Sequence, residues 1–440
     1  MRGQRHRHHP APRRPINRHW STLRVSTENT LWIITGLTMA GIVLRPWRVP
    51  EAVWATLAVL ALILLKLIDP ASIATGAARG WDVYLFLAGM MLLAEMGRRH
   101  GVFDWLAAHT ARAAGGSGHR LFLLVYLAGT VVTVLLSNDA TAVVLTPAVY
   151  AVARAVGAPP LPYLFICAFV ANAASFVLPV SNPANLVMFG EQMPGLGEWL
   201  SLFLLPSLGA IAATGVALYL LLRGELTTAI RRDIEVPRLT TAGRLTVGAL
   251  AGAALLLGAA SARGMALGPV TLAAAVLTLL LVSVSTRVVP TATLRALSWD
   301  VLLMVAGLFV LIEALQQHGV VAALAAQLQA LQARWPDNAG NLTGALLAVA
   351  CNLFNNLPAG LLGAATLDHV DASSTLRAAA LIGIDLGPNL SVSGSLATIL
   401  WLTALRREGI QVGAWRFLAL GAVVMPAGLA AALALLWVRS

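Results

Sequence analysis

A short polar run interrupts an apolar part of the chain at residues 135–147, which read LLSNDATAVVLTP. Apolar segments lie on both sides of it, over Leu121–Leu136 and Ala142–Val156. An ionisable side chain inside hydrocarbon costs about 2.5–3.5 kcal/mol on insertion scales, so we expect Asp139 to face a protein-lined cavity and to be used there. Irregular backbone at membrane depth is tolerated only where it is buried in protein or lines a cavity. The run therefore predicts the tip of a re-entrant hairpin; the alternative is a kinked span with a buried, hydrogen-bonded Asp139.

The composition is typical of a polytopic helical membrane protein. Of the 440 residues, 58% are hydrophobic and only 11% are charged, which is far from a soluble domain. The many Gly and Ala residues favour close helix packing in lipid. The two cysteines, Cys167 and Cys351, lie in apolar segments and do not make a disulfide framework, so we interpret them as packing residues.

The net charge of +11 does not indicate nucleic-acid binding. Seven Arg residues lie before residue 25, in a stretch that we interpret as a basic, disordered tail over residues 1–29. Most other basic residues lie in loops between apolar segments, and their distribution favours an N-terminus outside the cell. The tail itself disagrees with that orientation, because its seven Arg residues would then lie outside the cell.

The two halves of the chain repeat each other. The sequence DVYLFLAG at Asp82–Gly89 matches DVLLMVAG at Asp300–Gly307, which begins 218 residues later. At the same offset Asn138 falls on Asn356, so the repeat predicts a second polar tip in NLFNNLPAG at Asn352–Gly360.

Each half also contains an apolar segment broken by Pro, Gly and polar residues. The first break reads LPVSNPAN at Leu178–Asn185 and the second reads DLGPNLSVSGS at Asp385–Ser395. Ser181 aligns with Ser393 at an offset of 212. Interrupted segments at matching positions of two halves are the best sequence indication of a secondary-transporter binding site.

These features predict an all-α polytopic membrane protein with two inverted repeats, about ten transmembrane helices, two re-entrant hairpins and two broken helices. The repeats are inverted because each half makes five crossings, an odd number. The expected divisions are a first repeat at 30–222 with hairpin 121–156 and broken helix 161–190, a basic cytoplasmic linker at 223–241, and a second repeat at 242–440 with hairpin 341–366 and broken helix 375–403. The amphipathic stretches Val102–Ala113 and Val320–Ala333 are too short to span and are expected to lie along the membrane interface.

The tips and breaks supply mainly neutral hydrogen-bonding side chains. We expect the substrate to be bound by Ser137, Asn138, Thr141, Ser181, Asn182, Asn185, Asn355, Asn356, Asn389, Ser391, Ser393 and Ser395. None of the four interruptions contains Lys or Arg, so the lining favours a small neutral polyhydroxyl solute or a cation. Helix N-termini alone could still hold an anion.

Asp139 and Asp385 are the only carboxylates in these interruptions. Removal from water disfavours the ionised form of a carboxyl group, which suits a proton carrier, so we expect proton coupling at these residues. The alternative is a permanently charged aspartate that caps a half-helix. Glu95 and Glu313 fall at matching points near span ends and are interpreted as interfacial carboxylates beside Arg98 and Arg99, or beside His318.

The sequence has no phosphate-binding loop, metal-spaced Cys/His cluster or nucleophile elbow. We therefore expect neither an enzyme nor a bound metal or other cofactor. Pumping would need an ion gradient or a separate ATPase subunit.

Together the motifs resemble a known family. SNDAT at 137–141 with LTP at 145–147, VSN at 180–182, NNLP at 355–358, and DLGP at 385–388 leading into GSLATILW at 394–401 look like ArsB-type arsenite efflux permeases of the ion transporter superfamily. The resemblance runs from about residue 30 to the C-terminus, and its most specific part is Asp385–Trp401.

The resemblance implies export of arsenite, and of antimonite, across a bacterial inner membrane in exchange for protons, in some systems aided by a soluble ATPase. It also implies an elevator-like movement of the domain that carries the hairpins. Arsenous acid is uncharged at neutral pH and has three hydroxyls, which suits an Asn/Ser-lined site.

Two positions depart from the family pattern. Many members have a Lys directly after the Gly-Pro, where this chain has Asn389, and an Asp near the position of Asn172. Other hypotheses are a sodium/proton antiporter or a dicarboxylate-like anion carrier on the same scaffold. A membrane enzyme or assembly protein is disfavoured, because paired broken helices are costly without a solute path.

Overall fold

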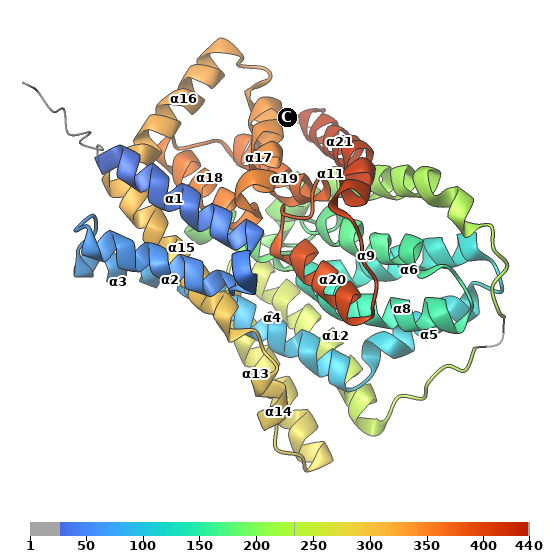
Figure 1. The fold of residues 1–440 in the computed structure, drawn as a ribbon. Helices are drawn as coiled ribbons and strands as arrows, with labels where there is room; N and C mark the ends of the chain where they lie inside the picture. The colour runs from blue at the N-terminus through green and yellow to red at the C-terminus, as the bar shows by residue number, and fades with distance from the viewer. Residues whose placement is uncertain (1–26, 233, 439–440) are drawn as a thin grey trace, which may run out of the picture.

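The computed structural model describes residues 27–232 and 234–438, which form a helical protein (Figure 1). Apart from helices, the described part contains one isolated antiparallel bridge, between Ser117 and Ala229. The basic tail expected at 1–29 lies outside the described residues except for its last three, which begin the first helix. Among the described residues between Leu226 and Thr241 there is no helix.

Eleven α-helical segments make up the first half of the described chain. They are α1 (Thr27–Leu44), α2 (Glu51–Leu64), α3 (Pro70–Arg79), α4 (Trp81–Arg99), α5 (Val102–Ala113), α6 (Gly118–Leu135), α7 (Asn138–Ala140), α8 (Thr146–Ala155), α9 (Pro160–Ala173), α10 (Pro183–Phe189) and α11 (Leu196–Leu222).

The second half of the described chain has ten α-helical segments. They are α12 (Thr241–Ala262), α13 (Leu267–Thr286), α14 (Thr291–Arg295), α15 (Trp299–Gln317), α16 (Val320–Arg334), α17 (Ala339–Phe354), α18 (Asn356–His369), α19 (Ser374–Leu386), α20 (Leu396–Arg407) and α21 (Ala414–Trp437).

Matching parts of the two halves form matching helices. α4 and α15 both contain 19 residues and begin 218 residues apart. α5 and α16 also begin 218 residues apart, each after a glycine in the left-handed region, Gly101 at φ 70° and Gly319 at φ 80°. Packing joins the halves, because α4 lies along α13, α2 along α15, and α11 along α21. The inverted orientation of the second half stays a prediction.

Six helices of the described chain are long and apolar enough to cross a membrane, and a seventh span results if α3 and α4, bent by 48°, are taken together. The prediction of about ten spans is therefore not confirmed. The physical reason is that the chain is cut into short pieces: α2, α9 and α17 are apolar but have only 14, 14 and 16 residues. Irregular backbone between α9 and α10 and between α19 and α20 separates helices that would otherwise be longer.

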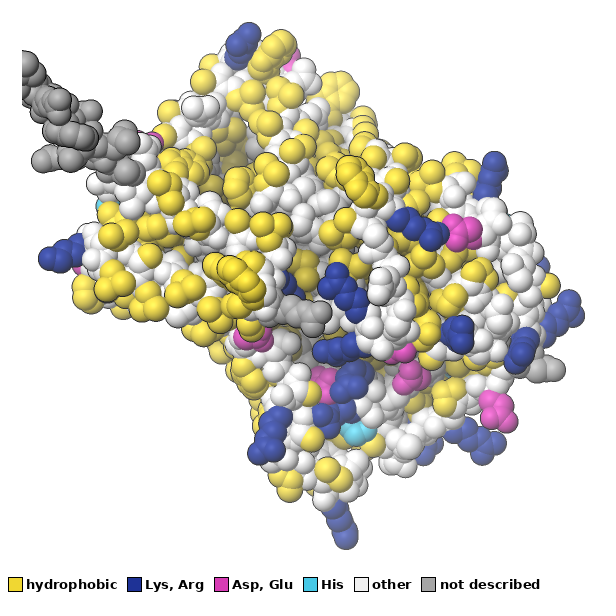
Figure 2. All heavy atoms as spheres, in the orientation of Figure 1, with side chains coloured by type: hydrophobic (Ala, Val, Ile, Leu, Met, Phe, Trp, Pro, Cys, Tyr) yellow, Lys and Arg dark blue, Asp and Glu magenta, His cyan; other side chains and the backbone are white. Residues whose placement is uncertain are grey.

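The outer surface of α1 and α2 is apolar. Figure 2 shows hydrophobic side chains over these helices, with Lys and Arg gathered mainly at the edges and lower middle of the same face. Trp32, Leu37, Leu57 and Leu64 are among the exposed side chains. Such a large exposed apolar area indicates contact with lipid or with another apolar partner.

α17 and α19 approach closely because small residues lie at their crossing. A Cβ atom added to Gly383 would overlap the carbonyl of Gly344, and one added to Gly344 would lie 2.6 Å from the Ala379 carbonyl oxygen. Small residues at helix crossings let backbones approach within membrane proteins. This crossing places the second hairpin directly against the helix that leads into the second break.

We predict that Gly383→Ala lowers the thermal midpoint of the purified protein, because the added methyl group has no room against a backbone carbonyl and overpacking costs about 1–3 kcal/mol. Gly340→Ala is the matched control, since its Cβ would make an ordinary 3.6 Å contact with Ala379 Cβ. The thermal midpoint of each variant is measured as the temperature at which half of the protein is lost from its size-exclusion peak after heating. Equal midpoints for the two variants would contradict the tight crossing.

Candidate functional site

The two broken helices meet at Asp385, which is 1% exposed near the end of α19. Its Oδ2 accepts a hydrogen bond from Ser175 Oγ at 2.6 Å and its Oδ1 accepts one from Asn182 Nδ2 at 2.8 Å. Asn182 also caps α10, because its Oδ1 accepts from Ala184 N at 3.0 Å. One carboxylate therefore fixes the break between α9 and α10 against the helix that leads into the other break.

A pair of neutral side chains, Asn172 and Asn389, lies next to Asp385 and Ser175 in the sequence: Asn389 is four residues after Asp385, and Asn172 is three residues before Ser175. Asn172 Nδ2 donates to Asn389 Oδ1 at 2.9 Å, and Asn389 Nδ2 donates to the Phe169 carbonyl at 3.2 Å. Asn172 and Asn389 are 1% and 0% exposed. These are the two positions at which the sequence departs from the ArsB-type pattern, so both departures concern one contact.

The two breaks bind their hairpins through matching hydrogen bonds. Ser181 Oγ donates to the Val134 carbonyl at 3.0 Å, and Ser393 Oγ donates to the Asn352 carbonyl at 3.0 Å. Ser181 and Ser393 are equivalent in the two halves at the offset of 212 residues, and Val134 and Asn352 are equivalent at the offset of 218. Each bond satisfies a carbonyl near the end of the first hairpin arm, where the helix has no partner for it.

The first hairpin tip makes mostly local contacts. Ser137 Oγ accepts from Ala140 N at 3.1 Å, and Asn138 Oδ1 accepts from Asp139 N at 2.9 Å. Thr141 Oγ1 lies 2.8 Å from Thr133 Oγ1 on the facing arm. The carboxylate of Asp139 is partly exposed and forms no hydrogen bond with any residue that the structure describes.

A π-helical turn follows this tip, over Thr141–Leu145. Pro147 lies in the first turn of α8 and has no N–H to donate to a preceding carbonyl. A single π-turn inside a helix is frequent at functional sites. Here it separates the Asp139 tip from the regular helix behind it.

The second tip is held by a larger network centred on Asn352. Asn352 Nδ2 donates to the Ala348 and Gly387 carbonyls at 2.8 and 3.0 Å, and Asn352 Oδ1 accepts from Ser391 Oγ at 2.7 Å. The backbone also pairs across the gap, since Asn356 N donates to the Gly394 carbonyl at 2.9 Å.

Other expected binding residues stabilise the turns. Asn185 Nδ2 donates to the carbonyls of Ser175, Leu178 and Pro179, at 2.9, 3.2 and 3.2 Å. Ser395 Oγ caps α20 by accepting from Thr398 N at 3.1 Å. Asn355, at φ 71°, caps α18 at Leu357 N. These contacts hold the interrupted backbone in place.

Sequence reasoning missed Asn172 and Ser175 as members of the site, and Asn352 as its organiser. Asn172 appeared only as a departure from the family pattern, and Asn352 only as the first residue of the second polar tip. Asn172 and Asn352 lie in the last turn of an apolar helix, and Ser175 lies just after the first of these helices. Their position at the edge of an interruption was the available signal.

The two breaks contain no Lys or Arg. In the part of the chain that the structure describes, neither Asp139 nor Asp385 forms an ion pair with Lys or Arg. Arg377 is 3% exposed on α19, rather than in a loop as most basic residues were expected to be, and it donates to the Met188 carbonyl and to Asp368.

The two matching glutamates both form ion pairs. Glu95 pairs with Arg98 and Arg99 at 2.7 and 2.6 Å, as the sequence suggested. Glu313 pairs with Arg79 of α3 at 2.6 Å, so its partner is not His318, whose ring nitrogen bonds the Ala314 carbonyl.

The cysteines lie on different helices, and both are free and buried. Cys167 Sγ faces the Tyr163 carbonyl and Cys351 Sγ faces the Ile384 carbonyl. Within the described ranges, no group of three His, Cys, Asp or Glu residues is placed to hold a metal ion.

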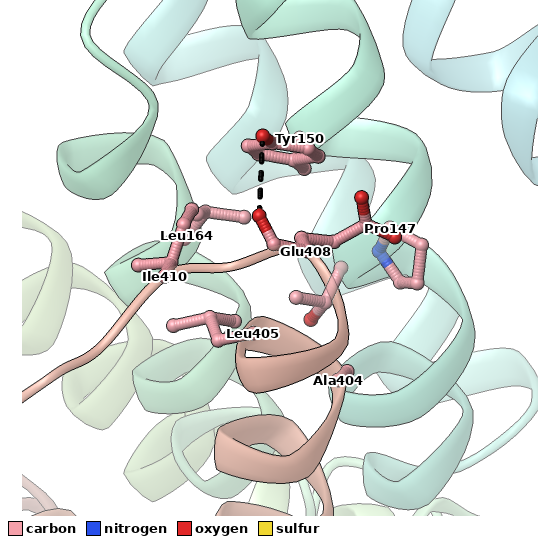
Figure 3. Close-up of a pocket in the computed structure, with 8 residues that line it drawn as sticks. Pro147, Tyr150, Leu164, Ala404, Leu405, Glu408 and Ile410 are labelled. Carbon is pink, nitrogen blue, oxygen red and sulfur yellow. Dashed lines mark hydrogen bonds between the residues drawn. The ribbon is translucent and has the colours of Figure 1, made fainter.

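A small apolar pocket lies beside the first hairpin rather than at the breaks (Figure 3). Tyr150 donates across it to the Glu408 carbonyl at 3.4 Å. Its lining consists of Thr146, Pro147, Tyr150, Leu164, Ala404, Leu405, Glu408 and Ile410. The pocket packs α8 against the end of α20 and has few groups that could orient a polar solute.

Comparison with known proteins places the chain among membrane transporters. The profile of the citrate transporter family, CitMHS, matches residues 30–384. The arsenical pump membrane protein of Escherichia coli strain K12 is 28% identical over 396 residues, covering 86% of this chain and 90% of the relative. That of Yersinia enterocolitica is 29% identical over 347 residues, covering 76% and 80%. The resemblance stated from the motifs is confirmed.

A solved structure also has a similar fold. The YdaH transporter of Alcanivorax borkumensis aligns with a TM-score of 0.55 at 16% identity, covering 84% of this chain and 89% of that one.

We predict that the Asn172–Asn389 contact accepts a charged pair but not a single charge. Asn172→Asp or Asn389→Lys alone places an unpaired charge at a buried position, which should lower the yield of folded protein and its thermal midpoint. The double variant pairs the charges and should recover much of both. A double variant no better than the worse single variant, in the same size-exclusion assay, would show that the two side chains do not interact.

Proposed function

The chain belongs to the citrate transporter (CitMHS) family and is a multi-pass membrane transporter, and from this premise we propose that it exports arsenite, and antimonite, across a bacterial inner membrane in exchange for protons. The relatives named arsenical pump membrane protein support this substrate. The single observation that carries the proposal is the junction of the two broken helices, where Asp385 is surrounded by neutral hydrogen-bond donors and neither break contains Lys or Arg.

The junction offers hydrogen bonds without a fixed positive charge. Asn172, Asn182 and Asn389 provide amides there, and Ser175 provides a hydroxyl. A neutral solute with several hydroxyl groups can exchange hydrogen bonds with such groups, whereas an anion would be matched better by Arg or Lys. Arsenous acid has the required form. The expected binding residues at the tips and breaks remain part of this proposal.

Asp139 and Asp385 are the proposed proton-coupling groups. Asp385 is buried with two neutral donors, so its ionised form leaves a net charge in the interior, and a bound proton removes that charge. The Asp139 carboxylate has no hydrogen-bond partner among the described residues, and Asp139 lies in the short segment α7 between two apolar helices. Its environment leaves it open to a proton or a cation.

The proposed architecture is two inverted repeats of five crossings, with the N-terminus outside. The hairpins and broken helices form the moving part, and α2, α4, α13 and α15, which pair across the halves, form the support. A soluble ATPase subunit is an optional partner of this arrangement.

The alternative proposal is a sodium/proton antiporter or a dicarboxylate-like anion carrier. The name of the family favours an anion, and the unpaired Asp139 carboxylate favours sodium. The four interruptions contain no Lys or Arg, which argues against a dicarboxylate held there by a fixed cation.

We predict that everted vesicles carrying the wild-type protein accumulate arsenite when an inward-acid proton gradient is imposed. Asp139→Asn and Asp385→Asn should each lower the initial rate at least tenfold, because neither amide can carry the proton. Asp371→Asn, at an exposed loop position in the left-handed region, is the control and should transport normally. Rates are measured by arsenic content of the filtered vesicles.

Vesicles that contain folded protein but take up no arsenite would overturn the substrate. Uptake that survives collapse of the proton gradient and requires sodium would instead favour the alternative proposal. Normal rates in both aspartate variants would remove them from the coupling mechanism.

A further inference from the structure

The two hairpin tips form different numbers of hydrogen bonds with their breaks. The shared bond in each half runs from Ser181 or Ser393 to a carbonyl of the hairpin. Among the described residues, this is the one hydrogen bond between the first tip and its break. The second tip has four further hydrogen bonds. The Asn352 side chain accepts one from Ser391 Oγ and donates one to the Gly387 carbonyl. Asn356 N donates to the Gly394 carbonyl, and Asn355 Nδ2 donates to the Ser393 carbonyl.

The difference comes from particular side chains. At the offsets of the repeat, Asn352 is replaced by Val134 and Ser391 by Pro179, and neither replacement can make the second-half bonds. Gly394 permits the close approach, since a Cβ there would lie 2.5 Å from Pro388 Cα and 3.0 Å from Asn352 Oδ1. Its counterpart in the first half is Asn182, which turns instead to Asp385.

We infer that Asn352 is a positioning residue that fixes the second hairpin tip to the second break, and that the first tip, which carries Asp139, is the one that opens to the solute path. The π-helical turn at Thr141–Leu145 lies directly behind the first tip and interrupts the regular helix there. The second tip continues without such an interruption into α18. The inference holds whichever solute is carried.

The experiment compares thiol labelling at two equivalent positions. Single cysteines replace Ser137 and Asn355, which are 218 residues apart and 3% and 4% exposed, in a background where Cys167 and Cys351 are alanine. The rate of modification by a membrane-impermeant maleimide is measured in vesicles of both orientations. We expect the thiol at 137 to react at least tenfold faster than the thiol at 355.

Asn352→Val introduces the residue that the first half has at the equivalent position. It should raise labelling at 355 at least fivefold and leave labelling at 137 unchanged. Ser391→Ala removes one bond of the network and should give a smaller increase in the same direction, which provides a test if Asn352→Val does not fold. Leu353→Val is the matched control, because Leu353 is 64% exposed on the same helix and should change neither rate.

Equal labelling of the two tips in the parent protein would overturn the inference. So would labelling at 355 that neither Asn352→Val nor Ser391→Ala changes, or an equal rise at both tips, which indicates general loosening of the fold.

Discussion

Every peptide group in the interrupted segments must find a partner inside the protein, and this constraint shapes the whole core of the molecule. An unpaired polar group in an apolar environment costs several kcal/mol, so irregular backbone persists only where side chains complete it. The Asn185 side chain donates to three carbonyls at the first break, and Ser181 and Ser393 each donate to a carbonyl of a hairpin. The polar residues at the breaks are thus first of all the components that allow the breaks to exist.

The same constraint limits what charge the junction can hold. Asp385 receives two neutral donors and the Asn172–Asn389 pair carries no charge, so Asp385 is the carboxyl group that the described residues place at the crossing of the broken helices. A proton at that carboxyl changes the net charge of the junction without moving any backbone. A fixed cation nearby would hold the carboxyl ionised and would remove this freedom.

Much of the fold could be predicted because hydrophobic patterning and its interruptions are local features. The segment 121–156 consists of α6 to α8, from Gly118 to Ala155, with its helical interruption at the polar run, and the helices that flank both breaks lie where the Pro and Gly residues suggested. Its path as a re-entrant hairpin stays a prediction. Contacts between residues about 200 positions apart could not be predicted in this way. Ser175 reaches Asp385 and Arg79 reaches Glu313 only because the two halves pack against each other. The number of spans was also beyond reach, since an apolar segment does not reveal where its helix ends.

Repetition explains why the site is both regular and asymmetric. A duplicated segment inherits its backbone path, and the paired serine-to-carbonyl bonds preserve that path in both halves. Side chains beyond those bonds are free to diverge, and they have done so at Val134 and Asn352, at Pro179 and Ser391, and at Asn182 and Gly394. The proposed transport mechanism requires one part of the site to stay formed while another part moves. The two halves share a backbone path, and the second tip has more hydrogen bonds to its break than the first. The first tip can therefore move while the second stays in place.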